Sequence, residues 1–429
     1  MSGGAPSSAP SSGPTWFGQP RGLIILSLTN MWEQFSYFGM RALLVYYMTR
    51  QLMIGQEMSS LIYGTYTSLA YFTPIVGGAI ADRWLGKRRA VTIGALVMAL
   101  GHFLMAFEPA FYVALATIAL GNGLFLPTLP SQINDLYAAG DPRRPWAYNV
   151  YYVGVNVGAF LAPLVCGTLG ELYGWHWGFG AAGIGMLAGL AIYLLGGKYL
   201  PPEAPRAPPA VTERSTGRDV ILLLLAIGLA VTVFRAAYEQ VGNTLALWAA
   251  SGVDRAAAGF TIPMTWFISL NPLLVMLMTP FLLARWKRRA GAGREHSPVQ
   301  KMAIGALIVG AAYALLALAA WRAGEGQAGW LWLAGFFAIF TLGELYILPN
   351  GLGLFARLAP PRFGATTVAA WYLAIFTGSF AAGLVGTLWS SMNRSAFFLL
   401  LTAIAAVAGG LLVLLDRPAR RVIAARVEP

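Results

Sequence analysis

A carboxylate and a guanidinium lie close together inside a long apolar segment near the start of the chain. Residues 32–41 read WEQFSYFGMR, within a stretch at 23–48 that is otherwise mostly Leu, Ile, Phe, Tyr, Met and small residues. On a helix, Glu33 and Arg41 share one face but differ in height by about 12 Å, too far for a direct ion pair. A charge at the centre of a bilayer costs at least about 2.5 kcal/mol, so both residues are candidates for a functional role.

The composition indicates that the chain is a membrane protein. Of its 429 residues, 57% are hydrophobic and 11% are charged, and the mean hydropathy is +0.63. A soluble globular protein carries roughly 25% charged residues. Apolar runs of about 20 residues can span a bilayer. They recur twelve times, at about 22–50, 59–81, 90–107, 110–137, 147–171, 177–197, 219–250, 257–284, 299–321, 328–357, 364–390 and 395–415. We expect an all-α polytopic membrane protein with twelve transmembrane helices.

The positive charges predict the orientation of these helices. With the N-terminus placed inside, the inner segments carry 23 of the 29 Lys and Arg residues and the outer loops carry four, while Arg41 and Arg235 fall within spans. This asymmetry is typical of a protein with both termini in the cytoplasm. We expect a location in the plasma membrane, here the inner membrane of a bacterium. The net charge of +12 then reflects topology and not a surface for nucleic acid.

The sequence divides into five regions by composition. These are a disordered Ser/Pro/Gly/Ala-rich tail at 1–20, an N-terminal six-helix half at 21–197, a Pro-rich charged cytoplasmic linker at 198–218, a C-terminal six-helix half at 219–416 and a cytoplasmic tail at 417–429. The first tail has too few apolar residues to order itself.

The two halves repeat one another weakly. Residues 32–34 (WEQ) in the first span are matched by 238–240 (YEQ) in the seventh, and 121–127 (GNGLFLP) in the fourth by 343–349 (GELYILP) in the tenth. Each pair is separated by six spans. A parallel repeat of six-helix halves is the architecture of major-facilitator transporters, whose substrate site lies near the midplane between the halves. We expect this fold.

Depth along the helices predicts which intramembrane charges meet. Arg41 is 19 residues beyond the start of the first span and Glu239 is 20 residues beyond the start of the seventh. The two should therefore meet near the outer face, as a gate or as a fixed structural pair. Glu344 and Arg235 both lie near the midplane and could neutralise each other, or Arg235 could pair with Glu239 one turn away. Glu33 has no cation at its level, and an unpaired carboxyl group facing a cavity is a candidate proton carrier or a neutral hydrogen-bonding acid.

The sequence lacks patterns for enzyme chemistry. Its three histidines are isolated, and it contains no Ser-His-Asp arrangement, phosphate-binding loop or cluster of metal ligands. We expect a protein that is not an enzyme and that needs no cofactor or metal.

Seven segments, in order along nearly the whole chain, resemble signatures of the proton-dependent oligopeptide transporters, the POT or PTR family of the major facilitator superfamily. They are 33–41 (EQFSYFGMR), 63–66 (YGTY), 120–125 (LGNGLF), 152–158 (YVGVNVG), 238–240 (YEQ), 269–272 (SLNP) and 343–345 (GEL). The resemblance implies a secondary active transporter that imports di- or tripeptides together with protons by alternating access.

The resemblance also implies roles for individual residues. Glu344, with Asn156 and Asn271, would hold the amino terminus of the peptide. The pocket would be lined by Tyr37, Tyr66, Tyr152, Asn156, Asn271 and Trp371. The resemblance assigns proton coupling to Glu33 and Glu344, and the extracellular gate to Arg41 and Glu239.

The sequence departs from the family pattern in its charges. The family's first span usually carries Glu-x-x-Glu-Arg or Glu-x-x-Glu-Lys, whereas this chain has Asn30, Glu33 and Gln34 at those positions. The family's lysine in the fourth span is here Leu126, and Arg235 occupies a position that is commonly aromatic. The linker is also too short for the two additional helices that many bacterial members insert there.

These departures leave more than one reading of the substrate. Loss of both family cations removes the favourable site for a substrate carboxylate, because an unpaired charge in a dry pocket is costly. Arg235 could take over the carboxylate, so that the protein imports peptides with altered coupling. Alternatively, the substrate has an amine for Glu344 but little or no carboxylate, such as a modified peptide, an amide or an amine-bearing non-peptide metabolite. The plainest reading is that Arg235 only neutralises Glu239 or Glu344. A non-transporting sensor built on a transporter fold is a third class. The expected partners are a small peptide or peptide-like substrate, protons and the lipid bilayer.

Overall fold

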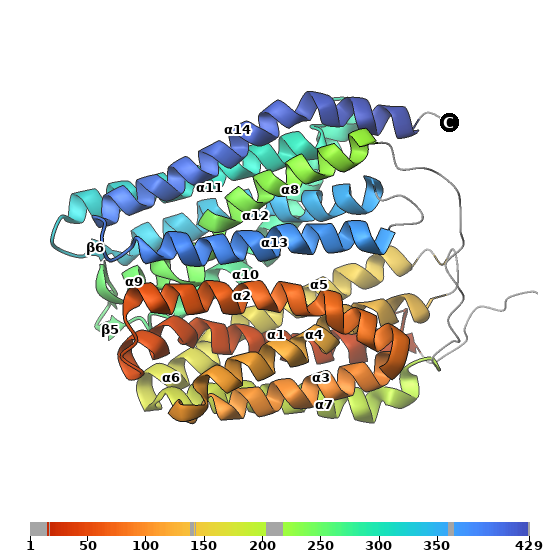
Figure 1. Cartoon of the computed structure of the whole chain (residues 1–429), viewed down its shortest axis with the longest axis horizontal. Helices are drawn as coiled ribbons and strands as arrows, with labels where there is room; N and C mark the ends of the chain where they lie inside the picture. The colour runs from red at the N-terminus through yellow and green to blue at the C-terminus, as the bar shows by residue number, and fades with distance from the viewer. Residues whose placement is uncertain are drawn as a thin grey trace, which may run out of the picture.

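Long helices, most of them running roughly along the longest axis of the molecule, make up nearly all of the structure (Figure 1). The computed structural model describes residues 15–16, 18–137, 141, 143–202, 218–358 and 364–427. Its helices are α1 (Arg21–Tyr46), α2 (Gln56–Ile80), α3 (Lys87–Leu104), α4 (Phe111–Asp135), α5 (Arg144–Ala162), α6 (Thr168–Tyr173), α7 (Trp175–Leu195), α8 (Arg218–Tyr238), α9 (Thr244–Ser251), α10 (Trp266–Gly291), α11 (Pro298–Ala323), α12 (Trp330–Leu358), α13 (Gly364–Thr387) and α14 (Arg394–Val427).

These helices form twelve membrane-length segments within the described ranges. A π-helical turn at Pro163–Gly167 joins α5 to α6, and a 3-10 turn at Glu239–Gly242 joins α8 to α9. Proline removes a backbone donor and clashes with the preceding turn, which accounts for the irregular helix at Pro163. The fold is therefore the expected all-α polytopic one.

Nine of the described helical segments are long and apolar enough to cross a membrane by length and composition alone. The segments that fall short are α1, α2 and α3. Polar residues lower the mean hydropathy of two of them: α1 contains Asn30, Glu33 and Gln34, and α3 begins with three consecutive cationic residues at 87–89.

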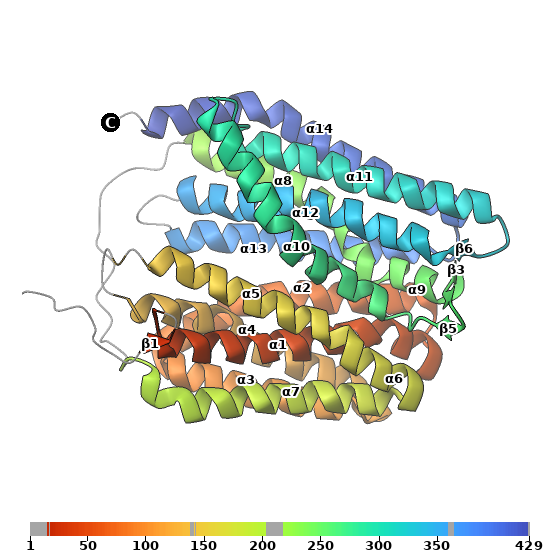
Figure 2. The same ribbon diagram turned by 180° about the vertical axis from the view of Figure 1, so that it is seen from behind.

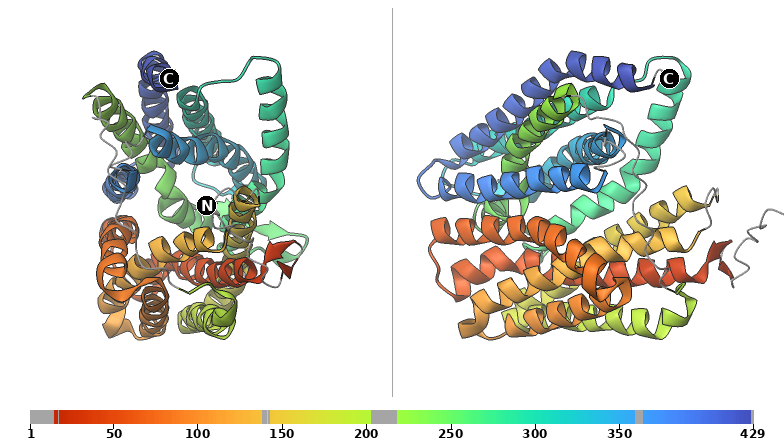
Figure 3. Two further views of the ribbon diagram at one scale, coloured as in Figure 1. Left: turned by 90° about the vertical axis from the view of Figure 1, so that its right-hand side faces the viewer. Right: turned by 45° about the vertical axis from the view of Figure 1, so that its right-hand side comes forward.

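The helices gather into two groups that follow the order of the chain. Helices α1–α7 form the first group and α8–α14 the second, on opposite sides of the molecule in Figures 1 and 2. Across their boundary α2 packs against α13, and α5 packs against α10, which crosses the others obliquely (Figure 2). The two groups diverge toward one end of the molecule (right-hand view of Figure 3).

The start of the eighth span differs from the sequence-based expectation. Hydropathy predicts this span at 257–284, whereas α10 begins at Trp266 and continues to Gly291. The residues before α10 form the short strands β3 (Val253–Asp254), β4 (Ala256–Ala257) and β5 (Phe260–Thr261), with Gly259 in the turn at φ +82°. Strand β3 pairs in parallel with β6 (Ala328–Gly329), which directly precedes α12.

Both predicted tails contain regular secondary structure where they are described. Helix α14 continues to Val427, through the region expected to be a tail at 417–429. Within the region expected to be disordered at 1–20, β1 (Thr15–Trp16) pairs with β2 (Gln19–Pro20). Most of the remainder of that region and most of the predicted linker at 198–218 lie outside the described residues.

Glycines allow close approach of α2 to two neighbouring helices. A Cβ atom on Gly77 would collide with the backbone of Gly123 on α4, and one on Gly64 would collide with the backbone of Gly383 on α13. Small residues at such crossings are the usual means of packing helices tightly in a membrane. Helix α2 is therefore closely packed within its own group and against the second group.

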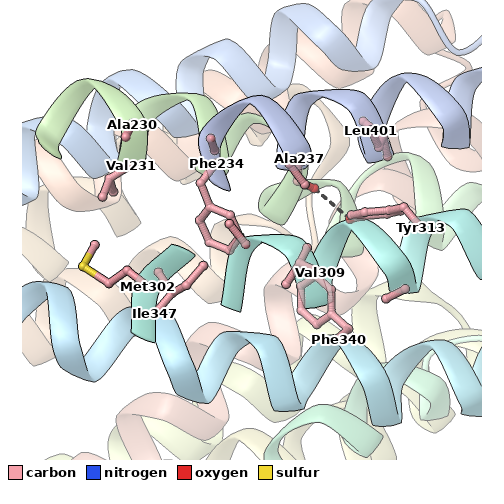
Figure 4. Packing of buried hydrophobic residues seen from close by; sticks show 14 of the residues in the cluster. Ala230, Val231, Phe234, Ala237, Met302, Val309, Tyr313, Phe340, Ile347 and Leu401 are labelled. Carbon is pink, nitrogen blue, oxygen red and sulfur yellow. Dashed lines mark hydrogen bonds between the residues drawn. The ribbon is translucent and has the colours of Figure 1, made fainter. Parts of the chain in front are cut away.

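The second group has a large apolar core that fixes the position of α8. Figure 4 shows Val231 and Phe234 of α8 facing side chains of α11 and α12, among them Phe340. The hydroxyl of Tyr313 on α11 donates a hydrogen bond of 2.7 Å to the backbone carbonyl of Ala237 (Figure 4). This packing holds the end of α8 that carries Arg235 and Glu239.

Candidate functional site

A cavity of about 860 Å³ lies between the two groups of helices. Its volume falls within the range of about 300–1,000 Å³ that is typical of small-molecule sites. Its wall includes the charged residues Arg41, Arg235 and Glu344 and the aromatic residues Phe38, Tyr71, Tyr148, Tyr151, Tyr152, Tyr238, Trp286, Phe340, Trp371 and Tyr372. Such a wall can hold a ligand that has both charged and apolar parts.

Hydrogen bonds join the two groups at one end of this cavity. The hydroxyl of Tyr46 donates to the carbonyl of Ala246 at 2.8 Å, and the hydroxyl of Ser60 donates to Asn243 at 3.0 Å. The carboxylate of Glu171 accepts from the backbone N–H of Thr265 at 2.9 Å. We call this end, where α1 and α8 finish and α2 and α10 begin, the closed end.

The cavity extends from the closed end toward the end at which the groups diverge. Its lining residues include Tyr148, near the start of α5, and Trp286, near the end of α10. Leu352, in the last turns of α12, also lines it. The structure therefore represents a state that is sealed at one end and that has its cavity directed toward the other.

An arginine pair shares one carboxylate at the closed end. Glu239, in the turn after α8, is fully buried and accepts hydrogen bonds from Arg41 on Oε2 and from Arg235 on Oε1. The guanidinium of Arg41 also donates through Nε to the hydroxyl of Tyr63 at 2.7 Å. Two cations and one anion give this cluster a net charge of +1, and both arginines line the cavity.

The partner of Arg235 is thus Glu239 and not Glu344, which decides between the two alternatives left open by the sequence. Arg235 is 2% exposed, and its guanidinium carbon lies 4.7 Å from the centre of the Tyr238 ring and 5.2 Å from that of Tyr71. Arg235 pairs with Glu239 because residues four apart along a helix are neighbours on its surface.

Glu344 has its own set of hydrogen-bond donors. The hydroxyl of Tyr238 donates to Oε1 at 2.6 Å and the amide of Asn271 donates to Oε2 at 2.5 Å. The Asn271 amide also donates to the hydroxyl of Thr341 at 3.1 Å, which fixes its orientation. Glu344 therefore presents an oriented carboxyl group to the cavity, suited to receive a cation such as an ammonium group.

The structure brings together six of the eight residues predicted to bind substrate. Those that line the cavity are Tyr152, Asn156, Arg235, Asn271, Glu344 and Trp371. Tyr37 and Tyr66 do not line it: both are buried, with their ring centres 6.5 Å apart in a stacked arrangement between α1 and α2. Their expected place in the pocket wall is therefore corrected.

The expectation that Glu33 faces the cavity is also corrected. Its side chain is 1% exposed and accepts a hydrogen bond of 2.6 Å from the side chain of Gln34, and it is Gln34 that lines the cavity. Adjacent residues on a helix point about 100° apart, so only one of the two can face the cavity. The Asn30 amide nitrogen and the Tyr66 hydroxyl are among the described polar atoms that are buried without a hydrogen-bond partner.

Sequence reasoning missed Tyr238 and Trp286 as part of the cavity wall. Tyr238 bonds Glu344, and its ring also packs on Arg235. Its signal is its place beside Glu239 in a segment repeated between the halves. Trp286 lies in a cationic stretch at 285–289, whose charges predict topology alone. Within the described residues, no three His, Cys, Asp or Glu side chains gather as metal ligands.

Comparisons with known proteins agree with this architecture. The sequence profile described as the POT family matches residues 88–213 and 210–400. The chain is 31% identical to the uncharacterized transporter YclF of Bacillus subtilis (strain 168), with 95% of each chain covered. It is 30% identical to a di-/tripeptide transporter of Lactococcus lactis subsp. cremoris, with 94% of this chain and 96% of the relative covered. A crystal structure of a peptide transporter POT in complex with sulfate superposes with a TM-score of 0.88 at 29% identity, covering 95% of this chain and 97% of the other.

Proposed function

The chain belongs to the POT family, and from this premise we propose that it is a secondary active transporter that imports di- or tripeptides or peptide-like substrates. Transport proceeds by alternating access and is coupled to protons, with coupling and carboxylate recognition altered from the family pattern. The similarity to a di-/tripeptide transporter over nearly the whole of both chains supports this substrate class.

The observation that carries the proposal is the geometry of Glu344. Its carboxyl group faces a cavity of peptide-accommodating size and is oriented by Asn271 and Tyr238. The amide of Asn156, also in the cavity wall, donates to the carbonyl of Tyr152 at 2.9 Å, which leaves its oxygen directed away from that bond. Glu344 and Asn156 together provide acceptors for the amino terminus of a peptide.

The other end of a peptide requires a positive charge. The Arg41–Glu239–Arg235 cluster has a net charge of +1, and its two arginines line the cavity. A substrate carboxylate can be stabilised by this excess charge without a lysine in the fourth span. Arg235 thereby contributes to carboxylate recognition, while Arg41 and Glu239 act as the extracellular gate.

Protons are carried in this proposal by Glu33 and Glu344. Both are carboxyl groups inside membrane-length helices, where an ionised group without a cation is unfavourable. Binding of an ammonium group requires the ionised form of Glu344, so the affinity of this site for substrate depends on the protonation of its carboxyl group. The carboxyl group of Glu33 lies one residue from the cavity wall, where Gln34 lines the cavity and donates a hydrogen bond to that carboxyl group.

We place the protein in the plasma membrane with both termini in the cytoplasm. In that orientation the closed end is extracellular and the cavity is directed inward. The asymmetry of Lys and Arg between the predicted inner and outer segments supports this placement.

The test is uptake of a radiolabelled dipeptide into liposomes with an inward-directed proton gradient. Wild-type protein should accumulate the peptide. In Glu344→Gln the uptake should fall by a factor of at least about ten, because a neutral amide no longer pairs with the ammonium group. A matched variant, Glu325→Gln, changes an exposed carboxyl group in the loop after α11 and should retain uptake. Full uptake by a folded Glu344→Gln protein would contradict the proposed site.

A second candidate function is transport of amine-bearing non-peptide metabolites. It is favoured by the pairing of Arg235 with Glu239, which leaves Glu344 as the charged group of the cavity without an ionic partner among the described residues. The two candidate functions are separated by measuring how strongly simple amines and N-acetylated dipeptides inhibit dipeptide uptake. Simple amines should inhibit strongly only if the carboxylate of the substrate is dispensable.

A further inference from the structure

The ion pair between Arg41 and Glu239 at the closed end includes a further cation, Arg235, which lies in the same group of helices as Glu239. Arg41 is on α1 of the first group, whereas Arg235 and Glu239 lie one helical turn apart in the second. The carboxylate of Glu239 is fully buried, and each of its oxygens accepts from a different arginine. Separation of the groups at this end would remove Arg41 from Glu239 and leave Arg235 in place.

Each arginine is also held by residues of its own group. Arg41 donates to the hydroxyl of Tyr63 on α2 at 2.7 Å. Arg235 donates to the hydroxyl of Ser379 on α13 at 3.3 Å. A Cβ atom on Gly378 would collide with the side chain of Arg235, so the glycine lets α13 approach α8 closely enough for this contact. The two arginines are therefore anchored to different groups and would move apart with them.

The remaining titratable groups around Glu239 do not supply another cation. They are Tyr37 on α1, Tyr63 on α2, Tyr238 on α8, Tyr313 on α11 and Glu344 on α12. Tyrosines are neutral at physiological pH, and Glu344 is held by its own two donors. Within the described residues, Arg41 and Arg235 are the cations that contact Glu239.

We propose that Arg235 is a resident counterion of Glu239, so that the closed end opens by moving Arg41 alone and Glu239 stays ionised in both states. A buried carboxylate that lost its single cation would take up a proton, because an isolated charge in a desolvated site is unfavourable. Arg235 removes that requirement. Opening is then not linked to protonation of Glu239, and the freed Arg41 becomes the unneutralised cation that meets a substrate carboxylate. The inference rests on the proposed alternating-access function.

The test measures opening directly by the distance between two spin labels. Labels are placed at Phe107→Cys and Glu325→Cys, exposed positions next to the closed end on the first and second groups, in full-length protein with Cys166→Ala. The ratio of open to closed molecules in nanodiscs is measured from about pH 5.5 to about pH 8.5. If opening required a proton on Glu239, the open state would bind one more proton and the ratio would rise about tenfold per unit fall in pH across its titration.

The decisive comparison isolates the part of the pH profile that depends on Glu239. We expect wild type and Glu239→Gln to have pH profiles of the same slope, and Arg235→Lys to match wild type because it keeps a cation. In Arg235→Gln, the ratio of open to closed molecules should rise steeply toward low pH. This rise should disappear in the double variant Arg235→Gln/Glu239→Gln. A steep wild-type profile that Glu239→Gln flattens would overturn the inference, even if the Arg235 variants do not fold. Dipeptide uptake is measured separately, so its absence contradicts the proposed function and leaves the distance profiles to decide the role of Arg235.

Discussion

The side chain of Glu344 is oriented by donors from two different helices, and this orientation gives a carboxyl group a defined direction into the cavity. Tyr238 bonds one oxygen and Asn271 bonds the other, while Thr341 fixes the amide of Asn271. Hydrogen bonds to a charged group contribute about 1.5–3 kcal/mol each. The affinity for an ammonium group therefore depends on residues that need not contact it.

Replacement of Asn271 by alanine tests this orientation. Asn271→Ala should raise the half-saturating dipeptide concentration about tenfold, with a smaller effect on the maximal rate, because Glu344 loses one of its two donors. Concentration-dependent uptake in liposomes gives both values. The control is Thr341→Val, which removes only the hydroxyl that accepts from Asn271 and should have a weaker effect. An unchanged half-saturating concentration in Asn271→Ala would show that Glu344 is positioned without it.

Helix α2 packs against α4 of the first group and against α13 of the second group at glycine positions, where no side chain would fit. Gly77 meets the backbone of Gly123 on α4, and Gly64 meets Gly383 on α13. In a membrane, close helix packing contributes stability that burial from water does not provide. These glycines set the distance at which α2 places Tyr63 beside Arg41.

A methyl group at Gly77 should separate α2 from α4. Gly77→Ala should lower the midpoint of thermal unfolding in detergent by several degrees, because the new Cβ meets backbone atoms that cannot rotate away. Gly180→Ala on α7 is the matched control, since its Cβ would have no neighbour within 4 Å, and alanine favours a helix by about 0.5–1 kcal/mol over glycine. Equal midpoints for the two variants would contradict this packing argument.

The whole molecule is asymmetric along its long axis. Hydrogen bonds between the groups gather at the closed end, and the cavity wall continues toward the other end. Alternating access requires a central site that is closed at one end while it is accessible from the other. Combined with the proposed topology, the structure corresponds to an inward-facing state.

Labelling from the two sides of the membrane checks this orientation. With Cys166→Ala as background, Glu325→Cys should react with an impermeant thiol reagent added outside intact cells, and Arg294→Cys should react only in inverted vesicles. Both positions are exposed, in the loop after α11 and the loop before it respectively. The reverse pattern of labelling would place the closed end in the cytoplasm and contradict the proposed direction of the cavity.

The sequence by itself determined the fold class and the meeting of Arg41 with Glu239. Helices that cross a bilayer need about 20 apolar residues, so the spans can be counted from hydropathy, except where a turn displaces the start of α10 to Trp266. Depth can be calculated because the rise per residue of a helix is constant. Two residues at equal depth on matching spans are expected to meet, and the structure contains their ion pair.

Only the tertiary structure decided which way each helix faces. Spacing places Arg235 within reach of both Glu239 and Glu344, and the packing of α8 against its neighbours decides for Glu239. In the same way, the rotation of α1 directs Gln34, and not Glu33, to the cavity. The rotation of a helix about its axis depends on the shapes of the side chains and helices packed around it. That information is distributed over the whole chain and is absent from the spacing of any one segment.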